Sequence, residues 1–410
     1  MSERPCILFT AFEPSGDEHA AAVIVELRRL LPDVPIYALG GPRMAEAGAE
    51  VLEQTSGMGL MLADSAGHVL EHYRRVGRLR KWLAGRSVAV HVPTDSPAAN
   101  WSFCKLLKRS FPSPEPGRPR TRVVHLVAPQ VWAWARWRVR RLRKLTDLVL
   151  CLLPFEPKWF RVHRVPAKFI GHPLFDDPLD PDALEWQAVH YPSGEPRFAL
   201  LPGSRSSELK AHWPIMLDAF ERIKRRWPDA AAVVAAVHDG VAEQLRKTAP
   251  QREDLRIVSG QTDAALRWAD AVLAVSGTVT LKVARHRKPM TILYRVRRVT
   301  WNLVGRWLMA TRTFTLPNLI ALGRAQNSRQ GHVVREFIPF WGDAQPLVDE
   351  LGRLIEDRAS HDRQVAALER VVGRFERHHA GREAAEAIAD KYRDAIEEMP
   401  DAPPEQRGQT

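Results

Sequence analysis

Short apolar runs alternate with amphipathic runs through the first 175 residues of the chain. The apolar runs, each followed by a helical pattern, are residues 6–12, 35–41, 87–93, 122–129 and 148–155. A strand covered on both faces is a continuous apolar run, and strands that alternate with helices build a parallel sheet flanked by helices. This half of the chain therefore predicts an α/β domain of the Rossmann type.

The alternation begins again at Arg197, after Asp176–Pro181, a cluster of aspartate and proline typical of a linker. The second series of apolar runs is 197–205, 231–238, 255–260 and 271–277. A proline-rich stretch at 111–119 predicts a surface loop. We expect an α/β fold with two Rossmann-like domains, arranged as 1–175, 190–340, C-terminal helices at 341–398 and a disordered tail at 399–410.

The composition of the chain indicates a large hydrophobic core and the cellular compartment. The chain has 410 residues, of which 45% are hydrophobic, which favours two domains over one. Cys6, Cys104 and Cys151 stand far apart, so neither a disulfide framework nor a zinc site is predicted. No segment resembles a signal peptide or a membrane-spanning helix of roughly 18 apolar residues. We expect a cytoplasmic protein.

The charge of the chain leaves several kinds of partner open. The net charge of +12 favours an anionic partner, and residues 134–144 and 294–301 mix arginine with tryptophan. Such a stretch is often an ordinary solvated helix face, but it also suits an anionic bilayer surface or a lipid-borne substrate. Nucleic acid is the least favoured of these partners. The sequence does not indicate an oligomeric state.

Three strand-to-helix turns carry residues suited to binding phosphate. They are 12–17 in the first half, and 201–208 and 275–280 in the second half. Glycine lets backbone N–H groups approach a phosphate, and a helix N-terminus adds partial positive charge. The same residue types also serve as ordinary helix N-caps. Neither G-x-x-x-x-G-K-S/T nor G-x-G-x-x-G occurs, which disfavours an ATPase or a dinucleotide enzyme.

An ordered series of motifs gives the chain a family resemblance. The motifs are Glu13-Pro14-Ser15-Gly16-Asp17 with His19, Gly40-Gly41-Pro42-Arg43-Met44, Met58-Gly59, Asp95-Ser96-Pro97 with Asn100, Pro129-Gln130-Val131-Trp132-Ala133-Trp134, Leu153-Pro154-Phe155-Glu156, Phe169-Ile170-Gly171-His172-Pro173, Leu201-Pro202-Gly203-Ser204-Arg205, Ser276-Gly277-Thr278 and Leu316-Pro317-Asn318-Leu319. In these motifs the chain resembles the lipid-A-disaccharide synthase family. The resemblance implies a GT-B fold, two Rossmann-like domains facing a cleft, with the helices of 341–398 packing back on the first half.

The resemblance also implies a reaction and a set of site residues. The family's inverting glycosyltransferases join UDP-2,3-diacylglucosamine to 2,3-diacylglucosamine 1-phosphate, release UDP, and associate peripherally with the inner membrane. Neither a cofactor nor a metal is implied. Asp95 is the candidate general base, and Arg205 would offset charge on the departing UDP. The resemblance places the UDP-sugar at Gly203, Ser204, Arg205, Ser276, Gly277, Thr278 and Asn318, and the acylated sugar-phosphate acceptor at Glu13, Ser15, Gly16, Asp17 and His19.

At four places the chain departs from the family pattern. Ala98 and Lys282 stand where the family has Asp and Glu, Leu62 stands where it has Glu, and the run Arg335–Pro339 differs. Lysine only donates hydrogen bonds, so Lys282 cannot reproduce a carboxylate's contacts with a ribose. The alternative hypothesis is therefore a non-catalytic or differently specific relative that binds a nucleotide, a lipid or a partner protein.

Overall fold

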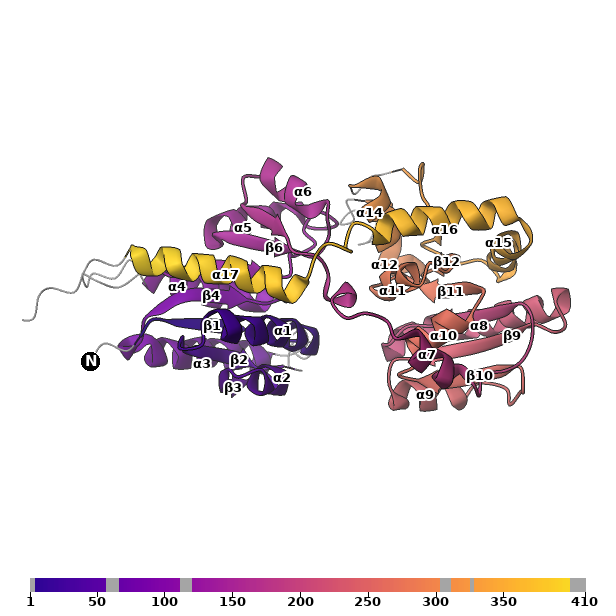
Figure 1. Cartoon of the computed structure of the whole chain (residues 1–410), viewed down its shortest axis with the longest axis horizontal. Helices are drawn as coiled ribbons and strands as arrows, with labels where there is room; N and C mark the ends of the chain where they lie inside the picture. The colour runs from indigo at the N-terminus through magenta and orange to yellow at the C-terminus, as the bar shows by residue number, and fades with distance from the viewer. Residues whose placement is uncertain (1–3, 57–65, 111–119, 303–310, 325–327, 399–410) are drawn as a thin grey trace, which may run out of the picture. The chain divides into compact units, whose positions relative to one another are not determined.

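The structure is a computed structural model that describes residues 4–56, 66–110, 120–302, 311–324 and 328–398. It divides into two compact units (Figure 1). Unit 1 comprises 1–131, 136–176 and 378–410, and unit 2 comprises 132–135 and 177–377. The expectations for Met58, Gly59, Leu62, the loop at 111–119 and the tail at 399–410 lie outside the described residues.

Unit 1 is built on a parallel sheet with the strand order β3-β2-β1-β4-β5-β6-β7. Its strands are β1 Cys6–Thr10, β2 Ile36–Gly40, β3 Glu50–Gln54, β4 Val88–Pro93, β5 Arg122–Leu126, β6 Leu148–Cys151 and β7 Ala167–Phe169. Its helices are α1 Pro14–Leu30, α2 Pro42–Glu46, α3 Ala66–Trp82, η1 Leu83–Gly85, α4 Pro97–Ser110, η2 Arg136–Arg138, α5 Val139–Leu145, α6 Glu156–Val162, η3 Pro173–Phe175 and α17 Ala380–Glu397.

Unit 2 repeats this plan with the parallel order β10-β9-β8-β11-β12-β13. Its strands are β8 Arg197–Leu201, β9 Ala231–Ala236, β10 Leu255–Ser259, β11 Ala271–Val275, β12 Met290–Leu293 and β13 Arg335–Phe337. Its helices are α7 Pro181–Ala188, α8 Ser206–Arg226, α9 Asp239–Arg246, α10 Thr262–Trp268, α11 Val279–Arg285, α12 Arg298–Thr300, α14 Leu316–Leu322, α15 Gln345–Glu356 and α16 Arg358–Val372. None of the helices that the structure describes is long and apolar enough to cross a membrane.

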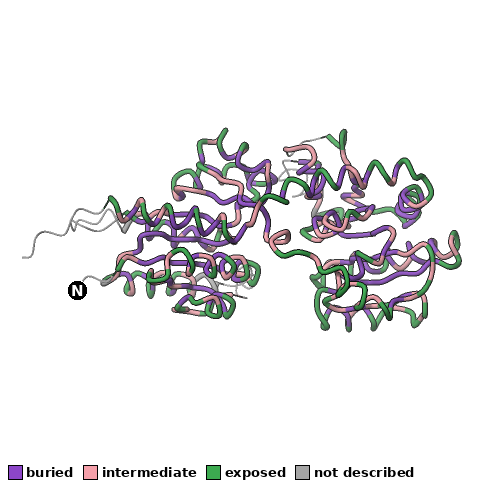
Figure 2. Tube along the Cα trace, viewed as in Figure 1, coloured by how far each residue is buried: buried purple, intermediate pink, exposed green. Residues whose placement is uncertain are grey.

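The central strands are mostly apolar because helices cover both faces of each sheet. Every residue of β1, β4 and β9 is buried, and in Figure 2 these strands lie in the purple interior of each unit. Neighbouring strands pair in parallel, for example Ile7 with Ile36 and Leu273 with Leu200. The two Rossmann-like domains predicted from the apolar runs are thus present.

The strand order reverses beside the first strand of each unit. β1 has β2 on one side and β4 on the other, and β8 has β9 on one side and β11 on the other. In open α/β sheets, ligands bind beyond the carboxyl ends of the strands at this switch point. The turns that follow β1, β4, β8 and β11 are therefore the places at which to look for a site.

The helices of 341–398 divide between the two units. In unit 2, α15 packs on α8, and the side-chain oxygen of Gln364 in α16 accepts from the backbone N–H of Met290 at 2.6 Å. In unit 1, α17 packs along α1, and the Tyr392 hydroxyl donates to the carbonyl oxygen of Pro5 at 2.9 Å. The sequence grouped these helices together, whereas only α17 belongs to unit 1 in the structure.

Asp17 is a structural residue of α1 in the interior of unit 1. Its side chain is buried, and its carboxylate accepts from the backbone N–H groups of Gly41, Arg43 and Met44 at 2.9, 3.1 and 3.3 Å. These N–H groups begin α2, where no preceding turn supplies acceptors. Both carboxylate oxygens of Asp17 therefore anchor α2, and its contact with the acceptor remains a prediction.

We predict that Asp17→Ala lowers the free energy of unfolding by about 3 kcal/mol, because buried N–H groups lose a charged acceptor. Urea unfolding followed by circular dichroism measures the change as a shifted midpoint. Glu18→Ala is the matched control, since Glu18 is exposed on the same helix turn and should change stability by less than about 0.5 kcal/mol. Equal midpoints for the two variants would show that the anchor contributes little.

Candidate functional site

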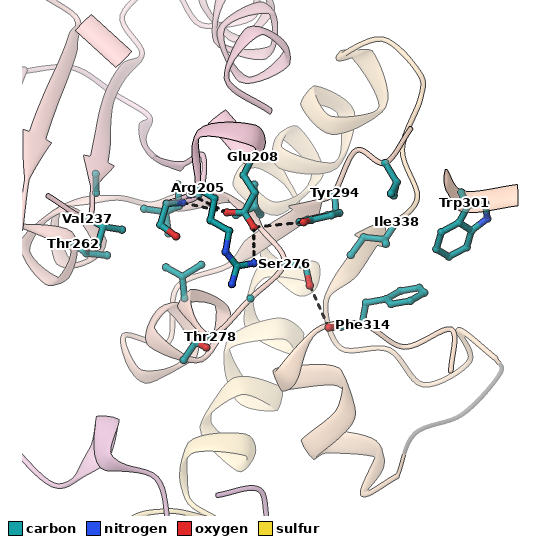
Figure 3. A pocket seen from close by; sticks show the side chains of 18 residues that line it. Arg205, Glu208, Val237, Thr262, Ser276, Thr278, Tyr294, Trp301, Phe314 and Ile338 are labelled. Carbon is teal, nitrogen blue, oxygen red and sulfur yellow. Dashed lines mark hydrogen bonds and ion pairs between the residues drawn. The ribbon is translucent and has the colours of Figure 1, made fainter. Parts of the chain in front are cut away.

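A pocket of about 680 Å³ opens at the carboxyl ends of β8, β9 and β11 in unit 2. Figure 3 shows the side chains that line it. Its described lining is Leu201, Gly203, Ser204, Arg205, Glu208, Ala235, Val237, Thr262, Val275, Ser276, Gly277, Thr278, Val279, Tyr294, Val296, Trp301, Phe314 and Ile338. The volume suits a ligand the size of a nucleotide. The structure thus brings six of the seven residues predicted for the nucleotide-sugar to one pocket.

The first pocket turn, after β8, is held open by Glu208. Gly203 has a φ of +107°, and a Cβ there would lie 2.8 Å from Oε2 of Glu208, so the turn requires glycine. The same Oε2 accepts from the N–H groups of Ser204 and Arg205 at 3.3 and 3.4 Å. The Arg205 side chain is 70% exposed, and Figure 3 shows it beside Glu208. The turn therefore places a cation at the N-terminus of α8, while its Ser204 and Arg205 N–H groups are engaged by Glu208.

The second pocket turn follows β11 and begins α11. The Ser276 hydroxyl donates to the carbonyl oxygen of Phe314 at 3.2 Å, and the Thr280 hydroxyl donates to that of Gly277 at 2.8 Å. A Cβ on Gly277 would meet no atom within 4 Å, so this turn borders open space. Together the two turns lie at the switch point between β8 and β11, each at the start of a helix, where partial positive charge favours an anion.

Asn318 lies behind the pocket wall and is hydrogen-bonded to the segment 333–336. It is fully buried, its amide nitrogen donates to Val334 and Glu336, and its oxygen accepts from Val333 and Val334, at 2.8 to 2.9 Å. Glu336 also accepts from the N–H groups of Phe314 and Thr315. Asn318 does not belong to the described lining of the pocket. Asn318 therefore holds the segment that brings Phe314 to the pocket wall, and its contact with the nucleotide-sugar remains a prediction.

Two polar residues of this pocket, Glu208 and Tyr294, lie in stretches that the sequence singled out, 201–208 and 294–301, but were given no role of their own in the site. The Tyr294 hydroxyl lies 3.5 Å from Oε1 of Glu208. Burial, followed by the charge of Glu208, raises the pKa of Tyr294, so Tyr294 remains a neutral donor. A glutamate at the third position of a helix is a capping signal, and this signal could have identified Glu208 as the residue that orders the turn. Tyr294 gave no such signal, because it comes at the end of an apolar strand.

In unit 1, the turns after β1 and β4 meet at the switch point. The Ser15 hydroxyl donates to Oδ2 of Asp95 at 3.2 Å, and the Ser96 hydroxyl donates to Oε1 of Glu13 at 2.7 Å. A Cβ on Gly16 would lie 3.2 Å from the Cβ of Ala11, which is closer than ordinary contact, so the position favours glycine. The structure therefore brings together Glu13, Ser15, Gly16 and Asp95, which were candidate site residues.

Burial disfavours the charged forms of His19 and His172. Burial lowers the pKa of His19, although the charge of Asp95 acts in the opposite direction. Burial, together with His19, lowers the pKa of His172 to about 4. Nδ1 of His172 accepts from the N–H of Leu174 at 3.1 Å, which a protonated ring nitrogen cannot do. His172 is therefore an N-cap of η3.

A family model described as lipid-A-disaccharide synthetase matches residues 7–389. The chain belongs to this family. Lipid-A-disaccharide synthase of Anaeromyxobacter dehalogenans (strain 2CP-1) is 35% identical over 379 residues, which cover 89% of this chain and 92% of the relative. The enzyme of Pseudomonas aeruginosa (strain LESB58) is 32% identical over 395 residues, with coverages of 95% and 98%. The chain is a glycosyltransferase of lipid A biosynthesis, a hexosyltransferase.

Solved structures with little sequence identity share the fold of this synthase. The glycotransferase of kitacinnamycin is 16% identical, with a TM-score of 0.58, and the match covers 95% of this chain and 100% of that one. UDP-GlcNAc 2-epimerase from Neisseria meningitidis is 11% identical, with a TM-score of 0.58 and coverages of 95% and 99%. These likenesses, with the two parallel sheets, show the GT-B fold.

The structure describes the surroundings of two residues that depart from the family pattern, Ala98 and Lys282. Ala98 is exposed in the first turn of α4. Lys282 donates to Oδ2 of Asp263 at 2.7 Å, and Nε2 of His286 lies 3.0 Å from Oδ1. Burial by itself would raise the pKa of Asp263, but the hydrogen bonds from His286 and Lys282 outweigh it and lower the pKa to about 2. Lys282 is thus engaged in an ion pair beside Thr262, a lining residue of the pocket.

A metal site requires several ligating side chains that lie close together. Within the described ranges, no three His, Cys, Asp or Glu side chains are grouped so as to hold a metal ion. The cationic group at the pocket turn is Arg205.

We predict that Gly203→Ala weakens UDP binding about tenfold or more, because the new Cβ displaces Glu208 and the N–H groups that it orders. Calorimetric titration with UDP measures the dissociation constant. Gly260→Ala is the control: Gly260 has a φ of +67° and a Cβ there meets nothing within 4 Å, so it adds backbone strain without crowding. Equal losses in both variants would contradict this account of the turn.

Proposed function

We propose that this synthase joins UDP-2,3-diacylglucosamine to 2,3-diacylglucosamine 1-phosphate, with the UDP group in the unit 2 pocket and the acceptor at the Asp95 turn of unit 1. The observation that carries the proposal is the pocket at the switch point of β8 and β11, which two turns border, each at the start of a helix. Its apolar walls include Val237, Val296 and Phe314. A pocket that joins apolar walls to helix N-termini suits a base linked to a diphosphate.

The diphosphate is expected beside Gly203, Ser204 and Arg205. The N-terminus of α8, a helix of 21 residues, points its partial positive charge at this turn. Arg205 is exposed enough to swing toward a phosphate, and its guanidinium can bind two phosphate oxygens at once. As the bond to the sugar breaks, the charge that develops on UDP is offset by this cation. We expect no divalent metal in that task.

The transfer is a direct displacement at the anomeric carbon. The acceptor hydroxyl oxygen forms a bond to that carbon while the bond from the carbon to the β-phosphate oxygen breaks, and the electron pair leaves with UDP. The hydroxyl proton passes to a carboxylate oxygen of Asp95. Attack from the side opposite UDP inverts the carbon. Ser15 and the N–H of Ser96, each bonded to one carboxylate oxygen, fix the direction of that group.

A surface of unit 1 suits the bilayer that would carry the acylated substrates. This basic surface consists of Trp137, which is 62% exposed, and the exposed residues Arg136, Arg140, Arg141, Arg143 and Lys144 on η2 and α5. Cationic side chains bind anionic head groups, and tryptophan favours the bilayer interface. We propose that the enzyme docks here on the cytoplasmic face of the inner membrane.

We predict that the variant Arg140→Glu/Arg143→Glu sediments with anionic phosphatidylglycerol vesicles at least about tenfold more weakly than the wild type, since each basic residue near the surface contributes about 1 kcal/mol. Vesicle sedimentation at increasing salt measures the partition. Arg225→Glu/Arg246→Glu, which makes the same charge change on unit 2, is the control. Equal loss in both variants would indicate attraction to net charge alone, and equal sedimentation with neutral vesicles would exclude head-group recognition.

We predict that Asp95→Asn lowers kcat about 10²- to 10⁴-fold through loss of the base, and that Arg205→Ala lowers it about 10²- to 10³-fold. Release of UDP from the two substrates in mixed micelles measures turnover. Arg225→Ala, at the far end of α8, should retain wild-type rates. If the wild type neither turns over nor binds UDP by calorimetry, the proposal gives way to the non-catalytic or differently specific relative.

A further inference from the structure

The turn that carries Asp95 has an unfavourable backbone conformation. Asp95 and Ser96 have φ angles of +50° and +31°, a region that residues with a Cβ rarely adopt. Such residues persist only where the surrounding structure holds them, and they concentrate at functional sites. The N–H of Asp95 donates to Leu126 on β5 at 3.0 Å, and the carbonyl oxygen of Ser96 accepts from the N–H groups of Ala99 and Asn100 at 3.1 and 3.2 Å. The carbonyl groups of Thr94 and Asp95 need other partners to keep the turn in place.

Asn100 supplies those partners from inside α4. Its side chain is fully buried. Its amide nitrogen lies 3.2, 3.0 and 3.4 Å from the carbonyl oxygens of Thr94, Asp95 and Ser96. Three successive carbonyls therefore converge on one donor group, which fixes the path of the backbone through the turn.

A second buried residue fixes the orientation of this amide. The Thr10 hydroxyl donates to Oδ1 of Asn100 at 2.6 Å and lies 2.9 Å from Nε2 of His91. Since the Thr10 proton is given to Asn100, Nε2 of His91 is the donor to Thr10. Burial and His125 lower the pKa of His91 to about 3, so the ring is neutral. The relay from His91 through Thr10 to Asn100 joins β4, β1 and α4 beneath the turn.

We infer that Asn100, oriented by Thr10, is a positioning residue that sets the place of the Asp95 carboxylate for proton transfer. The inference rests on the proposed role of Asp95 as the base. Asn100 is fully buried and acts through the backbone of the turn. A displacement of a reacting group by about 1 Å costs on the order of a hundredfold in rate, so loss of this support changes kcat and leaves substrate binding intact.

The test measures kcat, both KM values and UDP affinity in the full-length protein for Asn100→Ala, Thr10→Val and Thr10→Ser. We expect Asn100→Ala to lower kcat about ten- to a hundredfold and Thr10→Val to lower it about tenfold. KM values and UDP affinity should stay within about twofold of the wild type. Thr10→Ser, which keeps the hydroxyl, should have the wild-type kcat.

The matched control is Thr121→Val. Thr121 is as buried as Thr10, and its hydroxyl donates to the carbonyl oxygen of Val88 at 2.8 Å, at the opposite end of β4. A similar buried hydrogen bond is therefore lost far from the Asp95 turn. The control variant should keep the wild-type kcat even if its urea midpoint falls as far as that of Thr10→Val.

The deciding measurement combines Asn100→Ala with Asp95→Asn. If Asn100 acts only through Asp95, the double variant has the residual turnover of Asp95→Asn within about twofold. A further drop as large as that seen in the wild-type background overturns the inference, as does an unchanged kcat in Asn100→Ala and Thr10→Val. If Asn100→Ala does not fold, Thr10→Val combined with Asp95→Asn decides. A wild-type kcat in Asp95→Asn refutes the base itself, which is a separate failure.

Discussion

Both sheets reverse their strand order beside the first strand of the unit, at β1 and β4 in unit 1 and at β8 and β11 in unit 2. Right-handed crossovers then carry the chain away to opposite faces of the sheet, so the turns after these neighbouring strands are left facing each other. The Gly203 and Ser276 turns meet for this reason, and so do the Glu13 and Asp95 turns. Each candidate site is therefore a consequence of sheet topology before any side chain is considered.

The repeating strands and helices could be predicted because both elements leave a strong pattern in the sequence. A strand such as 231–236 is buried on both faces and contains only alanine and valine. The unit on which each C-terminal helix packs could not be predicted in the same way. The amphipathic patterns of α15 and α17 show that each helix buries one face, but the pattern of one helix does not say which sheet covers that face.

Some of the predicted site residues are accessible to solvent, whereas others are buried and hold backbone segments in place. Asp17 and Asn318 fit the motifs as well as Asp95 and Arg205 do, yet they are buried and fully engaged with backbone groups. Their partners lie 24 to 27 residues away for Asp17 and 15 to 18 residues away for Asn318. A motif records only that a polar residue follows a strand, so burial by a distant segment cannot be predicted from it. The ion pair of Lys282 with Asp263 is hidden from sequence reasoning for the same reason.

The electrostatic surroundings of Asp95 follow from burial of uncharged rings. His125 and His19 both feel the charge of Asp95, yet burial lowers the pKa of His125 to about 4 and that of His19 in the same direction. At neutral pH these rings carry no charge that would form an ion pair with the carboxylate. A carboxylate paired with a cation is a weaker base, because the charged form is favoured. Neither ring therefore places a cation beside Asp95, which agrees with the proposed role of this carboxylate as the base.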